Sequence, residues 1–294
     1  MTPDDFQKLA SILKSRSGLV LSADKAYLAE SRLTPLARTW EFADAKALIR
    51  GLVRREGKGG DPKLLVEVVE AMTTNESFFF RDTRPFDQLR DVVLPRLAES
   101  RGSAKRLRIW SAACSSGQEP YSIAMTIREL GARFRDWRIE IVATDLSRPI
   151  LKRAIDGRYT QFEVQRGLPI TLLAKYFRQD GDQWIIADEL KQMVKFQTHN
   201  LLEGPQSLGK FDIVFCRNVL IYFDQDTKKQ VLDSIAGVLP DDGFLTLGGA
   251  ETVLGVTDRF RMVEGQRGLY ARVPAASTNT TASAAPARPL GAAS

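Results

Sequence analysis

Apolar side chains recur at helical spacing through the first 72 residues of the chain. Phe6, Leu9 and Leu13 follow a helix start at residues 2–5, TPDD, which has a threonine cap and a proline in the first turn. Three more segments with helical spacing begin near residues 25, 43 and 63. Pro35 is expected to kink the second helix or to end it one turn early. The pattern predicts a small all-α domain over residues 1–72.

The hydrophobic period changes after residue 84. A helix over 85–100 precedes short runs of β-forming apolar residues, and these runs alternate with helices. The predicted strands begin at residue 107 and then cover 139–144, 194–197, 211–216, 244–247 and 269–273, the last of which should close the sheet. Such alternation is typical of α/β proteins with a doubly wound parallel sheet. We therefore expect an α/β domain over residues 85–273.

Three stretches depart from this alternation. Residues 73–84 join the two domains, and their FFFR run at 78–81 is too apolar for a free linker, so it should be pinned against the α/β domain. After a short helix at 170–177, turn residues at 180–182 separate two strand-like segments, which predicts an antiparallel subdomain inserted at about 158–196. Residues 274–294 hold few large apolar side chains and should form a disordered tail.

Small or polar residues follow four of the predicted strands. The loop at 111–117, SAACSSG, lies after the first strand, Asp145 ends the second, Asn200 follows the third, and Arg217 and Asn218 follow the fourth. Ligands of open α/β sheets bind at these carboxyl ends. The loop alone is equally compatible with an ordinary turn, because it has one glycine and lacks the G-x-G-x-x-G pattern. Asp145 favours a ligand with ribose hydroxyls.

Composition and charge narrow the class of protein only slightly. The 294 residues include 42 basic and 36 acidic side chains, and the net charge of +6 suits an acidic partner without requiring nucleic acid. Cys114 and Cys216 both fall at predicted strand ends, where we expect free thiols that line the pocket. The chain shows no signal peptide and no apolar run that would span a bilayer. A cytoplasmic protein is therefore expected, with no direct membrane insertion.

Five blocks of sequence, in order, resemble the chemotaxis receptor methyltransferases of the CheR type. They are MTTNESFFFR at 72–81, WSAACSSGQEPYSIA at 110–124, ATDL at 143–146, HNLL at 199–202 and FDIVFCRNVLIYFD at 211–224. The resemblance covers roughly residues 4 to 273. It implies a class I methyltransferase sheet that binds S-adenosylmethionine and releases S-adenosylhomocysteine. It further implies methyl transfer to glutamates on the cytoplasmic helices of chemoreceptors, and no nucleic-acid substrate.

The resemblance also implies roles for individual residues at the cofactor. Asp145 would accept hydrogen bonds from ribose hydroxyls, although a cap is the ordinary role of an acid at this position. Glu119 would offset the cofactor's positive charge, or else act as an acid at a helix start. Asn200 and Leu201 resemble the pair that meets adenine, or else form a polar turn. The other implied contacts are Asn75, Arg81, Arg217, Asn218 and Ser77, where the family often has threonine.

Methyl transfer to glutamate requires no catalytic base, because a carboxyl group with a pKa of about 4.3 is already ionised at neutral pH. The reaction requires in-line placement of a carboxylate oxygen against the methyl group. Arg81 and Tyr222 are the candidates for holding that carboxylate. His199 is the one histidine of the chain, and it is expected to be structural or at most to border the pocket. No metal ligand set is predicted.

Two other functions remain open from the residues. A methyltransferase acting on RNA, DNA or a small molecule would suit the basic charge, but amino-methylating enzymes carry an Asn/Asp-Pro-Pro-Tyr/Phe turn where this chain has CRNV at 216–219. A non-catalytic S-adenosylmethionine-binding adaptor is the second alternative, and retention of Arg81 and Tyr222 speaks against it.

Two parts of the sequence bear on how the protein would meet a receptor. Lys46, Arg50 and Arg54 share one helix face, which is either a solvated surface or a docking surface. The resemblance points first to the second helix, where this chain has Arg32 and Arg38. In the family, members that bind a peptide at the receptor's C-terminus add it as a strand to the inserted subdomain. The short loop at 179–183, QDGDQ, predicts that this chain is independent of such a pentapeptide.

Overall fold

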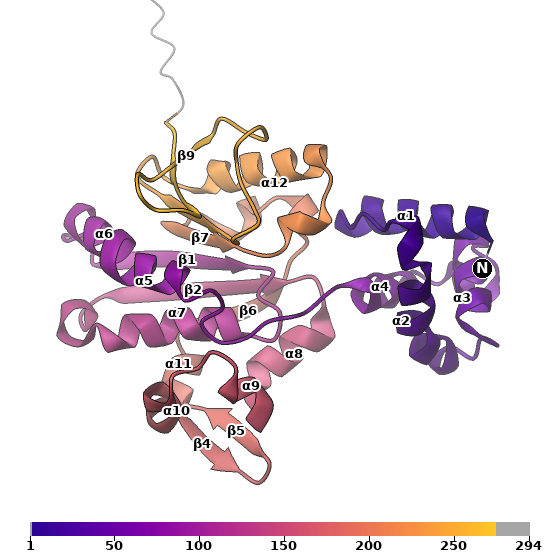
Figure 1. Cartoon of the computed structure of the whole chain (residues 1–294), viewed down its shortest axis with the longest axis horizontal. Helices are drawn as coiled ribbons and strands as arrows, with labels where there is room; N and C mark the ends of the chain where they lie inside the picture. Colours follow the sequence, from indigo (N-terminus) through magenta and orange to yellow (C-terminus); the bar gives the residue numbers. More distant parts are fainter. Residues whose placement is uncertain (1, 275–294) are drawn as a thin grey trace, which may run out of the picture.

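The computed structural model describes residues 2–274 (Figure 1). Except for Pro274, the predicted tail at 274–294 lies outside the described residues. Four helices form the N-terminal end: α1 (Pro3–Ser17), α2 (Ala26–Thr39), α3 (Ala45–Arg54) and α4 (Pro62–Met72), with short 3₁₀ turns η1 (Ala23–Lys25) and η2 (Gly57–Gly60). Thr2 caps α1 in a reciprocal pair with Asp5, as the start signal predicted. Leu9, Leu33 and Leu48 are fully buried in the separate core of these helices.

Helix α2 does not end before Pro35. It continues to Thr39, one turn beyond the proline, so the expected early end is wrong. Ala29, Leu33 and Ala37 are buried along one face of α2 on both sides of Pro35. Packing of that continuous face against the other helices offsets the missing backbone hydrogen bond.

A seven-stranded sheet forms the centre of the molecule, in the order β6-β2-β1-β7-β8-β10-β9. The first five strands in this order are parallel, and β10 and β9 are antiparallel to their neighbours. The doubly wound α/β fold is thus confirmed, with β1 flanked by β2 on one side and by β7 on the other. The strands are β1 (Arg106–Ala112), β2 (Arg138–Asp145), β6 (Val194–Thr198), β7 (Ile213–Cys216), β8 (Phe244–Leu247), β9 (Phe260–Met262) and β10 (Leu269–Arg272).

The predicted closing strand is not the edge of the sheet. The strand over 269–272 is β10, which pairs with β8 on one side and with β9 on the other. Strand β9 was not predicted, because its three residues, Phe260–Met262, include one buried side chain and show no alternation.

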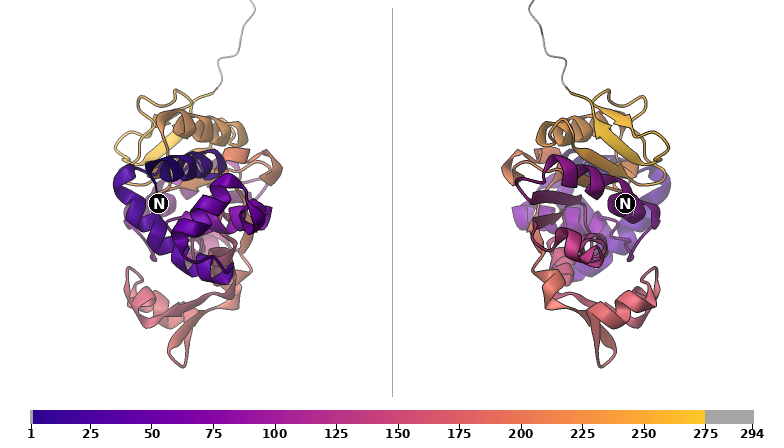
Figure 2. Two further views of the ribbon diagram at one scale, coloured as in Figure 1. Left: turned by 90° about the vertical axis from the view of Figure 1, so that its right-hand side faces the viewer. Right: turned by 90° about the vertical axis from the view of Figure 1, so that its left-hand side faces the viewer.

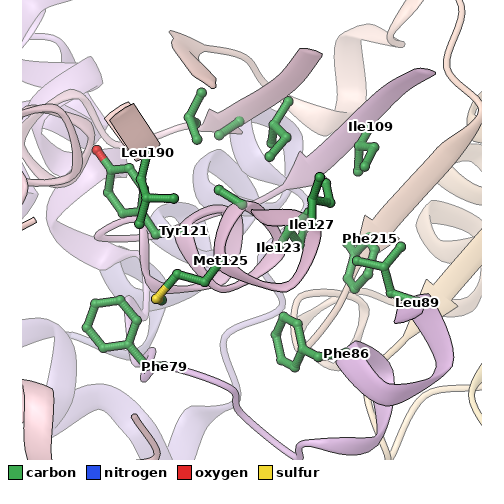
Figure 3. Close-up of a cluster of buried hydrophobic side chains, with 14 of the residues drawn as sticks. Phe79, Phe86, Leu89, Ile109, Tyr121, Ile123, Met125, Ile127, Leu190 and Phe215 are labelled. Atoms are coloured by element: carbon green, nitrogen blue, oxygen red, sulfur yellow. The ribbon is translucent and has the colours of Figure 1, made fainter. Parts of the chain in front are cut away.

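Helices cover both faces of the sheet (Figure 1). One face packs under the segment α5 (Arg84–Gln88), η3 (Leu89–Val93) and α6 (Leu94–Ser100), together with α7 (Gln118–Glu129) and η4 (Gly131–Phe134). Figure 3 shows part of this core, with Phe79, Met125 and Phe215 fully buried. The other face packs under α12 (Gln225–Val238). Short 3₁₀ turns follow β6 and β7 at η5 (Leu201–Glu203), η6 (Gln206–Leu208) and η7 (Leu220–Tyr222).

The predicted antiparallel subdomain is confirmed and projects from one side of the molecule (Figures 1 and 2). It follows α8 (Arg148–Asp156) and has three strands in the order β3-β5-β4. Its elements are β3 (Arg158–Thr160), α9 (Gln161–Gln165), α10 (Ile170–Tyr176), β4 (Phe177–Asp180), β5 (Gln183–Ile186) and α11 (Asp188–Lys191).

The connection between the two parts is pinned, as its apolar run predicted. Phe79 is fully buried, and its ring meets those of Tyr159 and Phe177 edge to face, at centroid distances of 4.9 and 5.5 Å. At the other end, Arg32 of α2 donates to the carbonyl oxygens of Met72 and Thr73 at 2.7 and 2.8 Å. Within residues 2–274, every helix is too short or too polar to span a bilayer.

Candidate active site

One cavity at the carboxyl ends of β1, β2, β6 and β7 brings all the predicted site residues together. They come from the connecting segment, the start of α7 and the loops after β2, β6 and β7. The ten predicted site residues are all among those that line it: Asn75, Ser77, Arg81, Glu119, Asp145, Asn200, Leu201, Arg217, Asn218 and Tyr222. The strand order runs from β1 to β2 and β6 on one side and to β7 and β8 on the other, so the sequence order of the strands reverses at β1. Doubly wound folds bind their ligands in the crevice at this point.

The loop after β1 adopts a left-handed conformation at alternate residues. Ala113, Ser115 and Gly117 have φ angles of 56°, 52° and 91°. A Cβ on Gly117 would lie 2.9 Å from the Cβ of Ala154, so a side chain there would collide with α8. Two of the three left-handed positions are thus held by non-glycine residues, so this backbone course does not depend on a glycine at each of them.

Asp145 holds this loop in place. It is 6% exposed, and its Oδ2 accepts from the backbone N–H of Ser115 at 2.9 Å while its Oδ1 accepts from Ser147 at 3.0 Å. Burial raises the pKa of Asp145, and the backbone hydrogen bonds oppose that shift. Asp145 is not the N-cap of α8, which is Ser147. Its carboxylate anchors the loops after β1 and β2 and has further acceptor capacity for a ligand hydroxyl in the cavity.

A buried arginine joins two acids on the wall of the cavity. The side chain of Arg217 is 1% exposed, and it donates to Glu119 at 2.9 Å and to Asp82 at 2.8 Å. Arg217 also donates to the carbonyl oxygen of Arg81 at 2.7 Å. Two carboxylates share one guanidinium, and of the two acids Glu119 lines the cavity whereas Asp82 does not. Glu119 thus acts within a network, and Asp82 is a member that the sequence did not reveal.

Asn200 and Leu201 line the same cavity, but Asn200 is already engaged. Its Oδ1 accepts from the backbone N–H of Leu202 at 3.2 Å, and its Nδ2 donates to the carbonyl oxygen of Arg16 at 2.7 Å. The polar-turn interpretation of Asn200 is therefore correct as far as its side chain goes. The second bond ties the loop after β6 to the end of α1.

Arg81 and Tyr222 lie at this cavity from different directions. The Arg81 guanidinium donates to the carbonyl oxygen of Glu76 at 3.0 Å and lies over the ring of Phe78, 5.5 Å from its centroid. The half-buried Tyr222 has its carbonyl oxygen hydrogen-bonded to the N–H of Val20 at 3.0 Å. The position of Arg81 thus depends on contacts within the connecting segment, and that of Tyr222 on a contact with the residues that follow α1.

The predictions for the histidine and the two cysteines have different outcomes. His199 is buried, borders the cavity and meets Trp110 edge to face at 6.0 Å, as expected; burial lowers its pKa. Cys114 lines the cavity, whereas Cys216 packs into the core beneath α12, so the expectation that both thiols line the pocket is wrong. Burial raises the pKa of both free thiols. Among residues 2–274, no group of three His, Cys, Asp or Glu is placed to hold a metal ion.

Two lining residues come from the N-terminal helical part. Ser17 at the end of α1 and Leu19 just after it form part of the cavity wall. No local pattern marks either residue, because their position depends on how the helices meet the sheet.

Comparison with known proteins identifies the family of this chain. The description "CheR methyltransferase, SAM binding domain" matches residues 75–269, and "CheR methyltransferase, all-alpha domain" matches residues 4–73. Among curated relatives, the chemotaxis protein methyltransferase of Vibrio parahaemolyticus is 40% identical over 92% of this chain and 96% of its own length. Chemotaxis protein methyltransferase 1 of Pseudomonas aeruginosa is 41% identical over 91% of this chain and 97% of its own length.

Likeness to solved structures is weaker. The TehB-like SAM-dependent methyltransferase of Corynebacterium glutamicum has a TM-score of 0.35 and 14% identity, covering 65% of this chain and 95% of that one. The sequence matches therefore carry the assignment. Both family descriptions and the full-length relatives agree on it: this chain belongs to the CheR methyltransferase family.

Proposed function

We propose that the protein transfers the methyl group of S-adenosylmethionine to glutamate side chains on the cytoplasmic helices of chemoreceptors. The products are glutamyl methyl esters and S-adenosylhomocysteine, and the site of action is the cytoplasm. The observation that carries the proposal is the single cavity at the strand ends, in which all ten candidate residues meet. The relatives named chemotaxis protein methyltransferase supply the substrate class.

The residues present fit the cofactor. The buried Asp145 lines the cavity with acceptor capacity for ribose hydroxyls, and Glu119 offers a carboxylate on the same wall to an amino group or sulfonium. Asn200 and Leu201 would meet adenine. Asn75, Ser77 and Asn218 supply further polar groups on the wall. The bound cofactor would contribute an activated methyl group.

The protein's part in the reaction is to place the glutamate. With a pKa of about 4.3, the carboxyl group is a nucleophile at neutral pH, so no proton has to be removed by the enzyme. We assign Arg81 and Tyr222 to holding this carboxylate in line with the methyl group. Both side chains line the cavity, whereas the guanidinium of Arg217 is already paired with Glu119 and Asp82.

The test is transfer of labelled methyl from S-adenosylmethionine to receptor-containing membranes, followed by mild alkali. Release of the label by alkali supports glutamyl esters. Label that resists alkali, or that enters nucleic acid, supports the other methyltransferase class, against which stands the CRNV turn after β7. Cofactor binding without any transfer supports the adaptor.

We further propose that the enzyme acts without a receptor pentapeptide. The two-residue turn at 181–182 joins β4 to β5, and Gly181 has a φ of 63°. Strand addition requires an accessible edge shaped by the adjoining turn. Asp180 pairs with Arg158 of β3 at 3.0 Å, which leaves Asp182 as the carboxylate to repel a peptide C-terminus. Titration with a pentapeptide ending in tryptophan and phenylalanine should show no binding. Micromolar affinity, about −8 kcal/mol, would contradict the proposal.

Contacts within the chain engage several of the basic residues that were considered for receptor docking. Arg32 is bound to the carbonyl oxygens at the end of α4, so it is occupied within the chain. Arg50 lies 3.8 Å from Asp5, and Lys46 lies 4.0 Å from Glu30. We propose Arg38 and the exposed Arg54 as the basic residues to test first at this surface.

A further inference from the structure

Glu251 is a buried acid that no part of the proposed reaction uses. It follows β8, is 8% exposed and does not line the cavity. Its two carboxylate oxygens accept four backbone N–H groups. Oε2 accepts from Asn218 at 2.8 Å and from Gly248 at 2.7 Å, whereas Oε1 accepts from Val219 at 2.9 Å and from Leu220 at 2.8 Å.

Three of these N–H groups belong to the segment 217–222, which carries much of the cavity wall. Arg217, Asn218, Val219 and Tyr222 all line the cavity. Asn218 has a φ of 59°, a conformation that the backbone does not favour without support. The consecutive backbone N–H groups of residues 218–220 all donate to the carboxylate of Glu251. These hydrogen bonds therefore hold the backbone of the segment 217–222 in its conformation.

Only a carboxylate satisfies all four donors. Each of its oxygens accepts two hydrogen bonds, and neither oxygen carries a hydrogen. A glutamine at this position would keep one oxygen but place an NH₂ group against the other two N–H groups. One pair of buried donors would then be left without an acceptor.

Gly248 keeps the space that this arrangement needs. A Cβ at Gly248 would lie 2.7 Å from Oε2 of Glu251, 2.8 Å from Nδ2 of Asn218 and 3.0 Å from the backbone nitrogen of Asn218. The neighbouring Gly249 has no atom within 4 Å of its own added Cβ. The two adjacent glycines therefore offer a matched pair of substitutions.

We propose that Glu251 is a positioning residue: it holds the segment 217–222 in the shape that binds the cofactor and presents Tyr222 to the substrate. Its part in methyl transfer rests on the function proposed above. Its part in holding the cavity wall is measured by binding of S-adenosylhomocysteine, which requires no receptor.

The test compares Glu251→Gln and Gly248→Ala with Gly249→Ala and the wild type. The first two variants should weaken S-adenosylhomocysteine binding by about tenfold, which is about 1.4 kcal/mol. They should also speed amide hydrogen exchange at 218–220 and lower kcat at saturating cofactor. Gly249→Ala should match the wild type in all three measurements.

Two results would overturn the proposal. One is wild-type affinity for S-adenosylhomocysteine in folded Glu251→Gln, even with a lowered Tm, because Glu251 would then be merely structural. The other is equal loss in Gly249→Ala and Gly248→Ala. If Glu251→Gln does not fold, Gly248→Ala decides the question by the same measurements. If the wild type methylates no receptor, the proposed function fails while the binding and exchange data still judge Glu251.

Discussion

Several side chains at this site already make hydrogen bonds within the chain, so they support the fold as well as lining the cavity. Asp145, Asn200 and Arg217 were predicted as ligand contacts, and each already holds backbone or side-chain partners in the chain. A polar group that is buried must have such partners, because an unpaired one costs free energy. Substitutions here will therefore change both the wall of the cavity and its contacts.

Asp145→Ala should weaken S-adenosylhomocysteine binding by about 1.5–3 kcal/mol, the range for a hydrogen bond to a charged group. Asp145→Asn separates the two roles, since it keeps an acceptor for one loop N–H but removes the charge. Calorimetry on both variants, with the Tm of each, measures the effect. Unchanged affinity would remove Asp145 from the ribose site.

Tyr222→Phe should lower turnover more than cofactor affinity. The variant keeps the ring on the cavity wall and loses only the hydroxyl that we assign to the substrate carboxylate. The expected loss in kcat is roughly tenfold, from one hydrogen bond to a charged group. Initial rates at saturating receptor, alongside calorimetry with S-adenosylhomocysteine, provide the comparison. Full turnover would show that the hydroxyl does no positioning.

His199 makes stability depend on pH. Burial lowers its pKa from 6.5, and Glu203 opposes this shift. The unfolded chain therefore binds the proton first as the pH falls, and the folded state loses stability from about pH 6.5 down to the lowered pKa. Wild type should lose more unfolding free energy than His199→Gln between about pH 7.5 and pH 5.5. Denaturant titrations at both values test this, and equal losses would contradict it.

At the scale of elements, the connecting segment is held by contacts with the α/β domain and with the inserted subdomain. Phe80, Asp82 and Thr83 have φ angles of 51°, 68° and 44°, which the surrounding contacts must hold. Arg217 supplies one such contact by donating to Arg81 and Asp82. Phe79 supplies the other by packing against the inserted subdomain.

Phe79→Ala should destabilise the protein by about 3–5 kcal/mol, because it leaves a cavity between the connecting segment and the subdomain. It should also weaken S-adenosylhomocysteine binding, since Ser77 and Arg81 flank it on the cavity wall. Phe162→Ala is the control, as that side chain is 71% exposed. Denaturant unfolding of both variants measures the difference. Similar stability of the two would mean that the segment is not anchored by Phe79.

At the scale of the molecule, the N-terminal helices complete the site. The end of α1 meets the α/β part through Lys14, which pairs with Asp224 at 2.6 Å, and through the bond from Val20 to Tyr222. The helices lie at the carboxyl end of the sheet in Figure 1. A cofactor in the cavity would therefore contact both parts of the chain.

Leu19→Ala should weaken S-adenosylhomocysteine binding by about 1–2 kcal/mol, because it removes apolar surface from the cavity wall. Val20→Ala should have little effect, since Val20 is 47% exposed and does not line the cavity. Saturating S-adenosylhomocysteine should raise the Tm of wild type more than that of Leu19→Ala. Equal shifts would place the ligand away from the helical part.

Local patterns in the sequence were sufficient to predict most of the elements and the residues of the candidate site. Helical spacing, caps and alternating apolar runs are local, so they located most helices and strands. The polar strand ends at Asp145, Asn200 and Arg217 could be read as one site because parallel strands present their carboxyl ends at the same edge.

Features that depend on contacts between distant residues could be seen only in the folded chain. Packing carried α2 past Pro35, pairing with β10 made a strand of Phe260–Met262, and the core beneath α12 took Cys216 away from the cavity. No local sequence pattern predicts that Leu19 lines the cavity or that Glu251 accepts hydrogen bonds from the segment 217–222. Each joins residues far apart in the chain, and only the folded arrangement sets which polar and apolar groups become partners.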